Sequence, residues 1–385
     1  MKLYAFELGR EHELCLEELL TVFPNAPLVA KSSKIAVFEL PEIENPKKLQ
    51  NHLGGTIRII EILERNPRDL RKAIESTIRG HFKDQTGKIP FAISPIGFPK
   101  NHKLNIRDFL NFSKKIIKSF GLNCRFVNKN FETPKPSTIF KAKVVEKGID
   151  ICIIDTQDFF VGKTIAIQNV NEYSLRDFDK PKRDARVGML PPKLAQIMIN
   201  LAGDADIIYD PFCGTGTVLI EGMLMRKKLV IGSDIEERLT GFSLENCEWT
   251  ERQFQTDTPF RLLTKDARRI NETDLKGVTA IITESYLGPP RISLPSQAMQ
   301  NNVFQELSQL HESWLNKAHQ FSGPDLKIVM CIPNYQSNQG RIPFPSFPKL
   351  ARKAGFNFIK SFAYGREGQT VVREVVILEK ISAEF

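Results

Sequence analysis

The sequence predicts an α/β protein whose C-terminal half forms a doubly wound, mostly parallel seven-stranded sheet. Three observations support this prediction. Apolar runs alternate with helical stretches from Pro191 onward, a glycine loop joins a strand to a helix at residues 210 to 217, and an acid ends the next apolar run. Such alternation is typical of a parallel sheet with helices on both faces.

The glycine loop spans Asp210 to Thr217 (DPFCGTGT) and follows the apolar run Ile207-Ile208-Tyr209. Its two glycines allow the backbone to approach a bound nucleoside closely. Asp234 lies 18 residues after the second glycine, a spacing that suits a carboxylate binding ribose hydroxyls. The loop lacks both the third glycine of dinucleotide sites and the Lys-Ser/Thr ending of phosphate-binding loops. The pattern therefore favours a nucleoside cofactor without a pyrophosphate or triphosphate.

The C-terminal half begins with a helix at Pro192, because helices tolerate proline in their first turn. The seven expected strands are 205 to 209, 229 to 233, 260 to 264, 278 to 283, 326 to 332, 356 to 362 and 371 to 379. No helix separates the last two strands, so one of them must be antiparallel.

The N-terminal half reads as an α+β region. Its expected elements are strands at 4 to 8, 35 to 40 and 89 to 93, helices at 11 to 22, 68 to 82 and 105 to 120, and a hairpin of strands 138 to 145 and 149 to 155. In the helix 105 to 120 the apolar residues share one stripe, and Lys114, Lys115 and Lys118 lie largely outside it.

Length and composition indicate a globular protein of two or three domains, because 385 residues exceed what one core serves. No apolar run approaches the roughly 18 residues of a membrane span, and acids near the start argue against a secretion signal. Six scattered cysteines suggest core residues in a reducing compartment. We therefore expect a cytoplasmic protein without a metal site.

Positive charge is concentrated in one segment. Residues 65 to 150 hold 19 Lys+Arg against 7 Asp+Glu, a net +12, whereas the whole chain carries +9 and the remainder is therefore −3. Such a field suits nucleic-acid binding. Ordinary solvated lysines on helix faces are the alternative. The polar segment Asn169 to Gly188 is either a linker or a nucleic-acid track that uses Lys182 and Arg183.

The loop Asp-Pro-Phe-x-Gly-x-Gly is similar to the S-adenosylmethionine site of class I (Rossmann-like) methyltransferases. With residues 187 to 195 (VGMLPPKLA) and the basic middle, the chain resembles tRNA guanosine N2-methyltransferases that carry ferredoxin-like and THUMP RNA-binding domains. The resemblance implies a ferredoxin-like domain at 1 to 60, THUMP at 61 to 168, a linker at 169 to 188 and a methyltransferase domain at 189 to 385. It also implies S-adenosylmethionine as cofactor and tRNA as partner.

The resemblance assigns site residues by position. The cofactor residues that match are Asp210, Phe212, Gly214 and Gly216 in the loop, Asp234 at the ribose, and Asp266 beside the adenine amine. A helix-capping role is the alternative for Asp266. The resemblance leaves open the target nucleotide, the number of methyl groups, the oligomeric state and the need for an activating protein partner.

The sequence departs from the family after strand 278 to 283. Amino-methylating relatives have Asp-Pro-Pro-Tyr-Gly there, whereas this chain has Glu284-Ser285-Tyr286-Leu287-Gly288. Glu284 could accept the hydrogen bond of an exocyclic amine, and Tyr286 could hold the base. We therefore expect these two residues in catalysis. Three functions stay open: methylation of a tRNA guanosine amine, methylation of DNA or another RNA, and nucleic-acid binding without catalysis.

Overall fold

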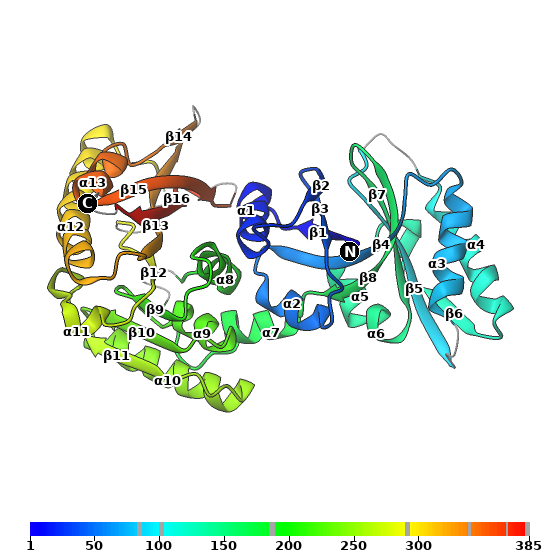
Figure 1. The fold of residues 1–385 in the computed structure, drawn as a ribbon, viewed down its shortest axis with the longest axis horizontal. Coiled ribbons are helices and arrows are strands. Elements are labelled where there is room, and N and C mark those ends of the chain that lie inside the picture. The colour runs from blue at the N-terminus through cyan, green and yellow to red at the C-terminus, as the bar shows by residue number, and fades with distance from the viewer. Residues whose placement is uncertain are drawn as a thin grey trace. The chain divides into compact units, whose positions relative to one another are not determined.

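A computed structural model of the chain describes residues 1–82, 87–99, 104–184, 189–288, 293–337, 340–366 and 369–381. The chain divides into two compact units, Met1–Glu172 and Tyr173–Phe385, which Figure 1 shows in blue to cyan-green and in green to red. Within the described residues, no helix has the length and apolar character that crossing a membrane requires. All six cysteines are free thiols, and five of them are buried.

The first unit is built on an eight-stranded sheet with the order β2-β3-β1-β4-β8-β7-β5-β6. Its strands are β1 (Lys2–Leu8), β2 (Leu28–Lys31), β3 (Ile35–Leu40), β4 (Thr56–Arg65), β5 (Lys88–Ile96), β6 (Asn123–Phe126), β7 (Ile149–Asp155) and β8 (Phe159–Ile167). Its helices are α1 (His12–Val22), α2 (Pro46–His52), α3 (Leu70–His81), α4 (Ile106–Ser119), η1 (Lys129–Phe131), α5 (Pro136–Lys141) and α6 (Val144–Lys147), and α7 (Val170–Ser174) spans its boundary. Strand β5 runs parallel to β6 and β7, and the other pairs are antiparallel.

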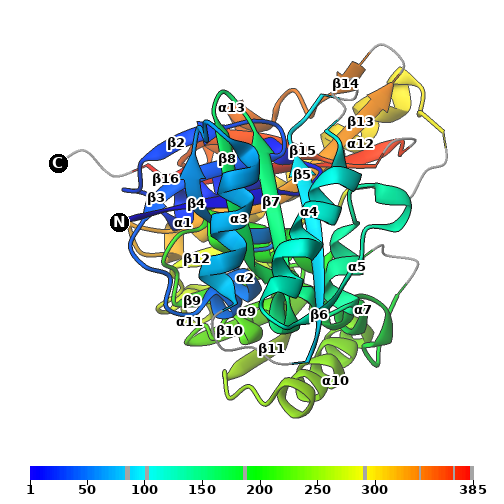
Figure 2. The same cartoon turned by 90° about the vertical axis from the view of Figure 1, so that its right-hand side faces the viewer.

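Helices α3 and α4 lie side by side over the β5–β7 end of this sheet (Figure 2). Helix α4 buries Leu110, Ser113, Ile116 and Ile117 on its inner stripe, as the sequence predicted. Lys115 and Lys118 are exposed and Lys114 is partly exposed, so the charged side of the helix faces solvent. The amphipathic pattern is therefore confirmed for this helix.

The expected strand at residues 138 to 145 is wrong, because this segment forms α5 and α6. Pro136 occupies the first turn of α5, where its fixed φ favours a helix. Lys143 at φ 52° separates the two helices, and Ile139 and Val144 are buried against Ala92. The expected turn at Lys147-Gly148 is also wrong. The hairpin instead joins β7 to β8, a strand that the sequence analysis missed together with β2, β4 and β6.

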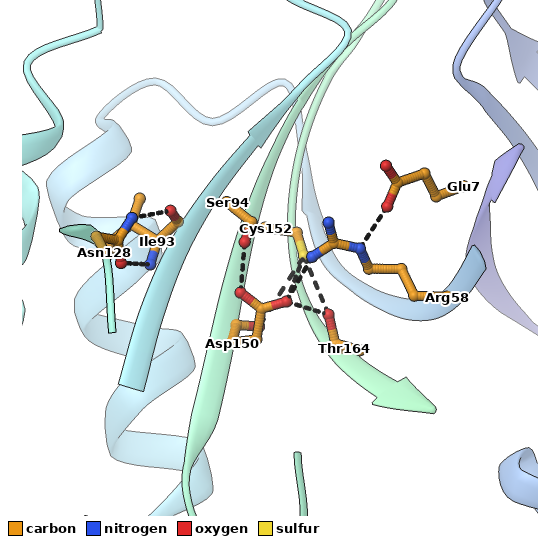
Figure 3. Close-up of polar contacts among 8 residues, drawn as sticks. All are labelled: Glu7, Arg58, Ile93, Ser94, Asn128, Asp150, Cys152 and Thr164. Atoms are coloured by element: carbon orange, nitrogen blue, oxygen red, sulfur yellow. Dashed lines mark hydrogen bonds and ion pairs between the residues drawn. The ribbon is translucent and has the colours of Figure 1, made fainter. Parts of the chain in front are cut away.

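A buried polar cluster crosses the middle of this sheet (Figure 3). Arg58 on β4 donates hydrogen bonds to Glu7 on β1 and, at 2.7 Å, to Asp150 Oδ2 on β7. Asp150 also accepts bonds from Ser94 Oγ and Thr164 Oγ1, each at 2.6 Å. Five strands are therefore linked through charged and hydroxyl groups inside the sheet.

The second unit contains the doubly wound sheet that the sequence predicted, with the order β11-β10-β9-β12-β13-β16-β15. Its strands are β9 (Ile207–Asp210), β10 (Leu229–Asp234), β11 (Phe260–Thr264), β12 (Ala280–Glu284), β13 (Lys327–Ser337), β15 (Phe356–Tyr364) and β16 (Val371–Lys380), and the short β14 (Gly340–Ile342) pairs with β13. Strand β16 is antiparallel to both neighbours, which confirms the expected antiparallel strand.

The helices of this unit are η2 (Leu175–Asp179), α8 (Pro192–Leu201), α9 (Thr217–Leu224), α10 (Glu237–Phe254), η3 (Ala267–Arg269), α11 (Glu272–Leu275), α12 (Gln297–Phe321) and α13 (Phe347–Lys353). Helices α8, α9 and α10 pack on one face, whereas α11, α12 and α13 pack on the other. The latter face buries Trp314 and Phe347 in a large apolar cluster. Both faces are thus covered, as a parallel sheet requires.

Candidate functional site

Three acidic residues end neighbouring parallel strands of the second unit. Asp210 ends β9, Asp234 ends β10 and Glu284 ends β12, and β9 lies between the other two strands. Ligands of open α/β sheets bind at the carboxyl ends of the strands. The fold therefore brings three of the predicted site residues to the edge where a ligand would bind.

The loop between β9 and α9 adopts a backbone that requires its glycines. Gly214 has φ 53° and Gly216 has φ 81°, both in the left-handed region. A Cβ at Gly216 would lie 3.0 Å from Ser243 Oγ, whereas a Cβ at Gly214 would meet no atom within 4 Å. Ser243 Oγ donates to the Gly214 carbonyl at 2.8 Å. The loop is therefore fixed from one side and open at Gly214.

Asp234 faces this open backbone. Its Oδ2 accepts a hydrogen bond from Gly214 N and its Oδ1 accepts one from Glu236 N, both at 3.0 Å. Burial raises the pKa of the carboxyl above its ordinary value. The carboxylate retains lone-pair capacity that could accept a bond from a ribose hydroxyl. Binding of an adenosine sugar by this carboxylate stays a prediction.

Asp210 and Phe212 anchor the start of the loop to β12 and α12. Asp210 is 3% exposed and accepts bonds from Thr283 Oγ1 at 2.6 Å and Phe212 N at 3.0 Å. Burial raises the pKa of Asp210 to about 7. The Phe212 ring packs edge-on against Trp314 with centroids 5.9 Å apart. Direct contact of either residue with a cofactor stays a prediction.

Lys180 and Asn246 also hold the loop, and sequence reasoning missed both. Lys180 Nζ donates to Thr217 Oγ1 at 3.0 Å and Thr215 Oγ1 at 3.4 Å, and burial lowers its pKa to about 8. Asn246 Nδ2 donates to the Thr215 carbonyl at 2.8 Å. The Thr-x-Thr hydroxyls could have suggested a buried donor, but nothing in the sequence pointed to Lys180.

The described part of the boundary segment, residues 169 to 184, packs against the second unit from Tyr173 onward. Arg176 donates to buried Glu221 at 2.7 Å. Lys182 lies 3.3 Å from Glu245, and Arg183 lies over the Phe178 ring. Contact of Lys182 or Arg183 with nucleic acid stays a prediction.

Asp266 follows β11 and caps η3. Its carboxylate accepts bonds from Arg268 N at 2.9 Å and from Arg268 Nη2 at 2.5 Å. The Arg268 side chain holds the pKa of Asp266 below its ordinary value. These bonds agree with the alternative role of Asp266 as a helix cap. Contact of Asp266 with an adenine amine stays a prediction.

Glu284 forms an ion pair with Arg373 of β16, which sequence reasoning also missed. Arg373 Nε donates to Glu284 Oε1, and both side chains are 16% exposed. Arg373 Nη2 donates to the Met189 carbonyl at 3.3 Å. The neighbouring Tyr286 is 52% exposed. No sequence signal links residues 284 and 373, because only the sheet order brings their strands together.

The arrangement suits a nucleoside cofactor. It combines the open backbone at Gly214, the carboxylate of Asp234 on β10 and the carboxylate of Glu284 on β12, with β9 between these two strands. Among the described residues no group of three or more His, Cys, Asp and Glu side chains could hold a metal ion.

This region is similar to known methyltransferases. Residues 180–286 match the family model of the RMKL-like methyltransferase domain. The chain is 26% identical over 302 residues to the tRNA (guanine(10)-N2)-dimethyltransferase of Methanocaldococcus jannaschii, covering 74% of this chain and 82% of the relative. It is 36% identical over 152 residues to the enzyme of the same name from Methanothermobacter thermautotrophicus, covering 38% and 40%.

Two solved structures share the fold. TrmN from Thermus thermophilus matches with a TM-score of 0.55 and 18% identity, covering 98% of this chain and 100% of that chain. SMU.472, a putative methyltransferase complexed with SAH, matches with a TM-score of 0.50 and 11% identity over all of both chains. Together with the strand order, these findings show that the second unit has a class I methyltransferase fold.

Proposed function

We propose that this chain, a methyltransferase of the RMKL-like type, transfers a methyl group from S-adenosylmethionine to the exocyclic N2 amine of a guanosine in tRNA. The bond between Gly214 N and Asp234 Oδ2 supports the cofactor assignment, because it joins the open loop to the ribose-binding acid. The names of the curated relatives support the choice of tRNA and of the guanine amine.

The cofactor would lie along Gly214 and Gly216, with its ribose at Asp234. When bound, it supplies an electrophilic methyl group on a positively charged sulfur. The protein's task is to orient the acceptor amine toward that methyl group and to exclude water. Lys180 and Asn246 support the loop, so the binding surface is formed before the cofactor arrives.

Glu284 and Tyr286 would hold the target base. A carboxylate is too weak a base to deprotonate a neutral amine, but it can accept the amine's hydrogen bond and stabilise the positive charge that develops on nitrogen. The half-exposed Tyr286 ring offers a flat surface for a base taken out of its stack.

The first unit would bind the tRNA, with residues 61 to 168 as a THUMP-like domain. Lys114, Lys115 and Lys118 lie on the outer side of α4. Near them, three arginines lie over phenylalanine rings, in the pairs Arg71–Phe112, Arg79–Phe120 and Arg107–Phe131. Cations bind phosphates and aromatic rings stack on bases, so this face suits RNA. The proposed substrate leads us to expect a cytoplasmic protein.

The test is methyl transfer from radiolabelled S-adenosylmethionine to unmodified tRNA, ribosomal RNA and duplex DNA, followed by mass spectrometry of the nucleosides. We expect label in tRNA, as N2-methylguanosine or its dimethylated form. Label in ribosomal RNA or DNA with none in tRNA would contradict the proposal.

The departure at Glu284-Ser285-Tyr286 favours a second candidate, a nucleic-acid-binding homologue that has lost catalysis. Calorimetry with S-adenosylmethionine separates the two candidates. A protein that binds tRNA but neither binds the cofactor nor labels any nucleic acid would be the inactive homologue.

A further inference from the structure

We propose that Arg373 is a positioning residue that orients the Glu284 carboxylate toward the methyl-accepting amine. This inference rests on the proposed function and names a residue outside the loop and motif that carry the family resemblance. Arg373 lies on β16, two strands away from β12, with β13 between them. Its guanidinium nonetheless reaches the last residue of β12.

The altered motif creates the need for such a residue. Two prolines would stiffen the backbone after a shorter aspartate, whereas this chain has Ser285 and Tyr286 after a longer glutamate. Ser285 is 2% exposed, and its Oγ donates to the Cys331 carbonyl at 2.8 Å, which fixes the backbone just after β12. That bond leaves the extra torsion of the glutamate side chain free to rotate. The ion pair with Arg373 removes this freedom.

The contact leaves part of the carboxylate available. Among the described residues, Arg373 is the hydrogen-bond partner of the Glu284 side chain, and it binds Oε1. Oε2 can therefore accept a bond from an exocyclic amine. The attraction of Glu284 raises the pKa of Arg373 although burial opposes its charge, so the guanidinium stays ionised beside the carboxylate.

An arginine suits this position better than a lysine. Its Nε binds Glu284 while its Nη2 binds the Met189 carbonyl at 3.3 Å, just before α8. One planar group thus links β12, β16 and the chain entering α8. A lysine has one nitrogen at the end of a flexible stem and would retain the charge without both contacts.

In the reaction, the lone pair of the amine nitrogen forms the new bond to the methyl carbon, and the electron pair of the broken C–S bond stays with sulfur. The nitrogen becomes positively charged and then loses a proton to water. A carboxylate held within hydrogen-bond distance stabilises that charge as it forms. Arg373 therefore acts on the rate through Glu284 without touching the base itself.

The test is a double-mutant cycle with Glu284→Gln, Arg373→Gln and the combined variant, assayed for methyl transfer to tRNA under single-turnover and steady-state conditions. We expect Arg373→Gln to lower kcat about tenfold or more, with KM for tRNA and Kd for S-adenosylmethionine within about twofold of wild type. The combined variant should be no slower than Glu284→Gln alone. Arg373→Lys should recover part of the lost rate.

The matched control is Lys327→Gln, which removes the 3.0 Å ion pair with Glu379 at the opposite end of β16. It should leave kcat unchanged. Additive losses in the cycle, or a wild-type kcat in Arg373→Gln, would overturn the inference.

A readout without turnover separates this inference from the proposed function. NMR can measure the rate at which the Arg373 Nε proton exchanges with solvent. This exchange should be slow in wild type and faster in Glu284→Gln, whether or not tRNA is the substrate. Wild-type protein that labels no tRNA contradicts the proposed function. Unchanged exchange of that proton contradicts the positioning role.

Discussion

Each unit contains an arginine that binds a carboxylate from a different strand, but the two arginines lie in different surroundings. The Arg58 side chain in the first unit is 2% exposed and lies between Glu7 and Asp150, whose side chain is fully buried. Arg373 in the second unit is 16% exposed and binds a single carboxylate at the carboxyl edge of the sheet.

The difference in burial distinguishes an ion pair that stabilises the fold from an ion pair that can take part in the reaction. Both oxygens of Asp150 already accept bonds, from Ser94 and from Thr164 and Arg58, so this cluster has little capacity left for a ligand. Glu284 keeps one oxygen at the edge of the sheet where we propose that the ligand binds. A buried charge with all its partners stabilises one arrangement of strands, whereas a partly exposed pair with a spare acceptor can act on a substrate.

The largest effect should follow from Arg58→Met. Removing the cation leaves Asp150 buried without its charge partner, and we expect the free energy of unfolding to fall by about 3 to 5 kcal/mol in urea titrations. The matched control is Arg65→Gln, which breaks the exposed pair with Asp158 and should change stability little. Equal losses in the two variants would remove the distinction between buried and exposed pairs.

Asp210 lies between the two cases, because it is buried in the second unit but has no cation as a hydrogen-bond partner among the described residues. Its folded pKa of about 7 lies above the ordinary value of 3.8. The folded state therefore keeps a proton that the unfolded chain releases, so stability present below about pH 4 is lost as the pH rises to about 7. Relative to Asp210→Asn, wild type should lose up to about 4 kcal/mol over this window, at about 1.4 kcal/mol per pKa unit.

Thermal or urea unfolding at several pH values measures this difference. The control is Asp257→Asn. The Asp257 side chain is 90% exposed, so the difference in stability between wild type and this variant should not change over the same pH range. A pH-independent difference between wild type and Asp210→Asn would show that Asp210 is ionised in the folded state.

Asp234→Asn should affect binding more than folding. It replaces one of the two acceptor oxygens at the proposed ribose site, and we expect Kd for S-adenosylmethionine to rise about ten- to a hundredfold in calorimetry. The control Glu237→Gln changes an exposed acid in the first turn of α10 and should bind normally. Normal cofactor affinity in Asp234→Asn would exclude this carboxylate from the site.

The smallest effect should follow from replacing Lys114, Lys115 and Lys118 with glutamine. We expect tRNA binding to be several-fold weaker and less dependent on salt. The slope of the logarithm of the binding constant against the logarithm of salt concentration should fall by about 0.7 to 0.9 for each phosphate that is no longer neutralised. The control replaces Lys34, Lys47 and Lys48, which are exposed elsewhere on the first unit. An identical loss of affinity in both triple variants would mean that net charge, not this face, determines the binding.

The sequence predicted the second unit better than the first, for physical reasons. The parallel strands β9, β10 and β12 are short, mostly apolar runs that each end at an acidic residue, so the apolar run and the acid together locate them in the sequence. In the first unit, Thr138 and Val145 have β-branched side chains that favour strands, but Pro136 and the burial of Ile139 produce helices. Tertiary packing there overrides local preference.

The residues of the candidate site also differ in how well the sequence predicted them. Gly214, Gly216 and Asp234 lie within one βαβ unit, where spacing along the chain determines spacing in the fold. Lys180 and Arg373 reach the site from distant segments, so their partners depend on the tertiary fold. Sequence periodicity carries no information about such pairs.

The pairing of β4 with β8 has a consequence for the synthesis of the protein. Arg58 and Ile167 face each other across these strands although 109 positions separate them. At about 5 to 20 residues per second, a ribosome needs roughly 5 to 20 s to make that interval. Throughout it, the nascent β1-β3-β4 ribbon presents an unpaired strand edge to other chains. The edge of β4 is therefore covered by its partner strand only after β8 has been made.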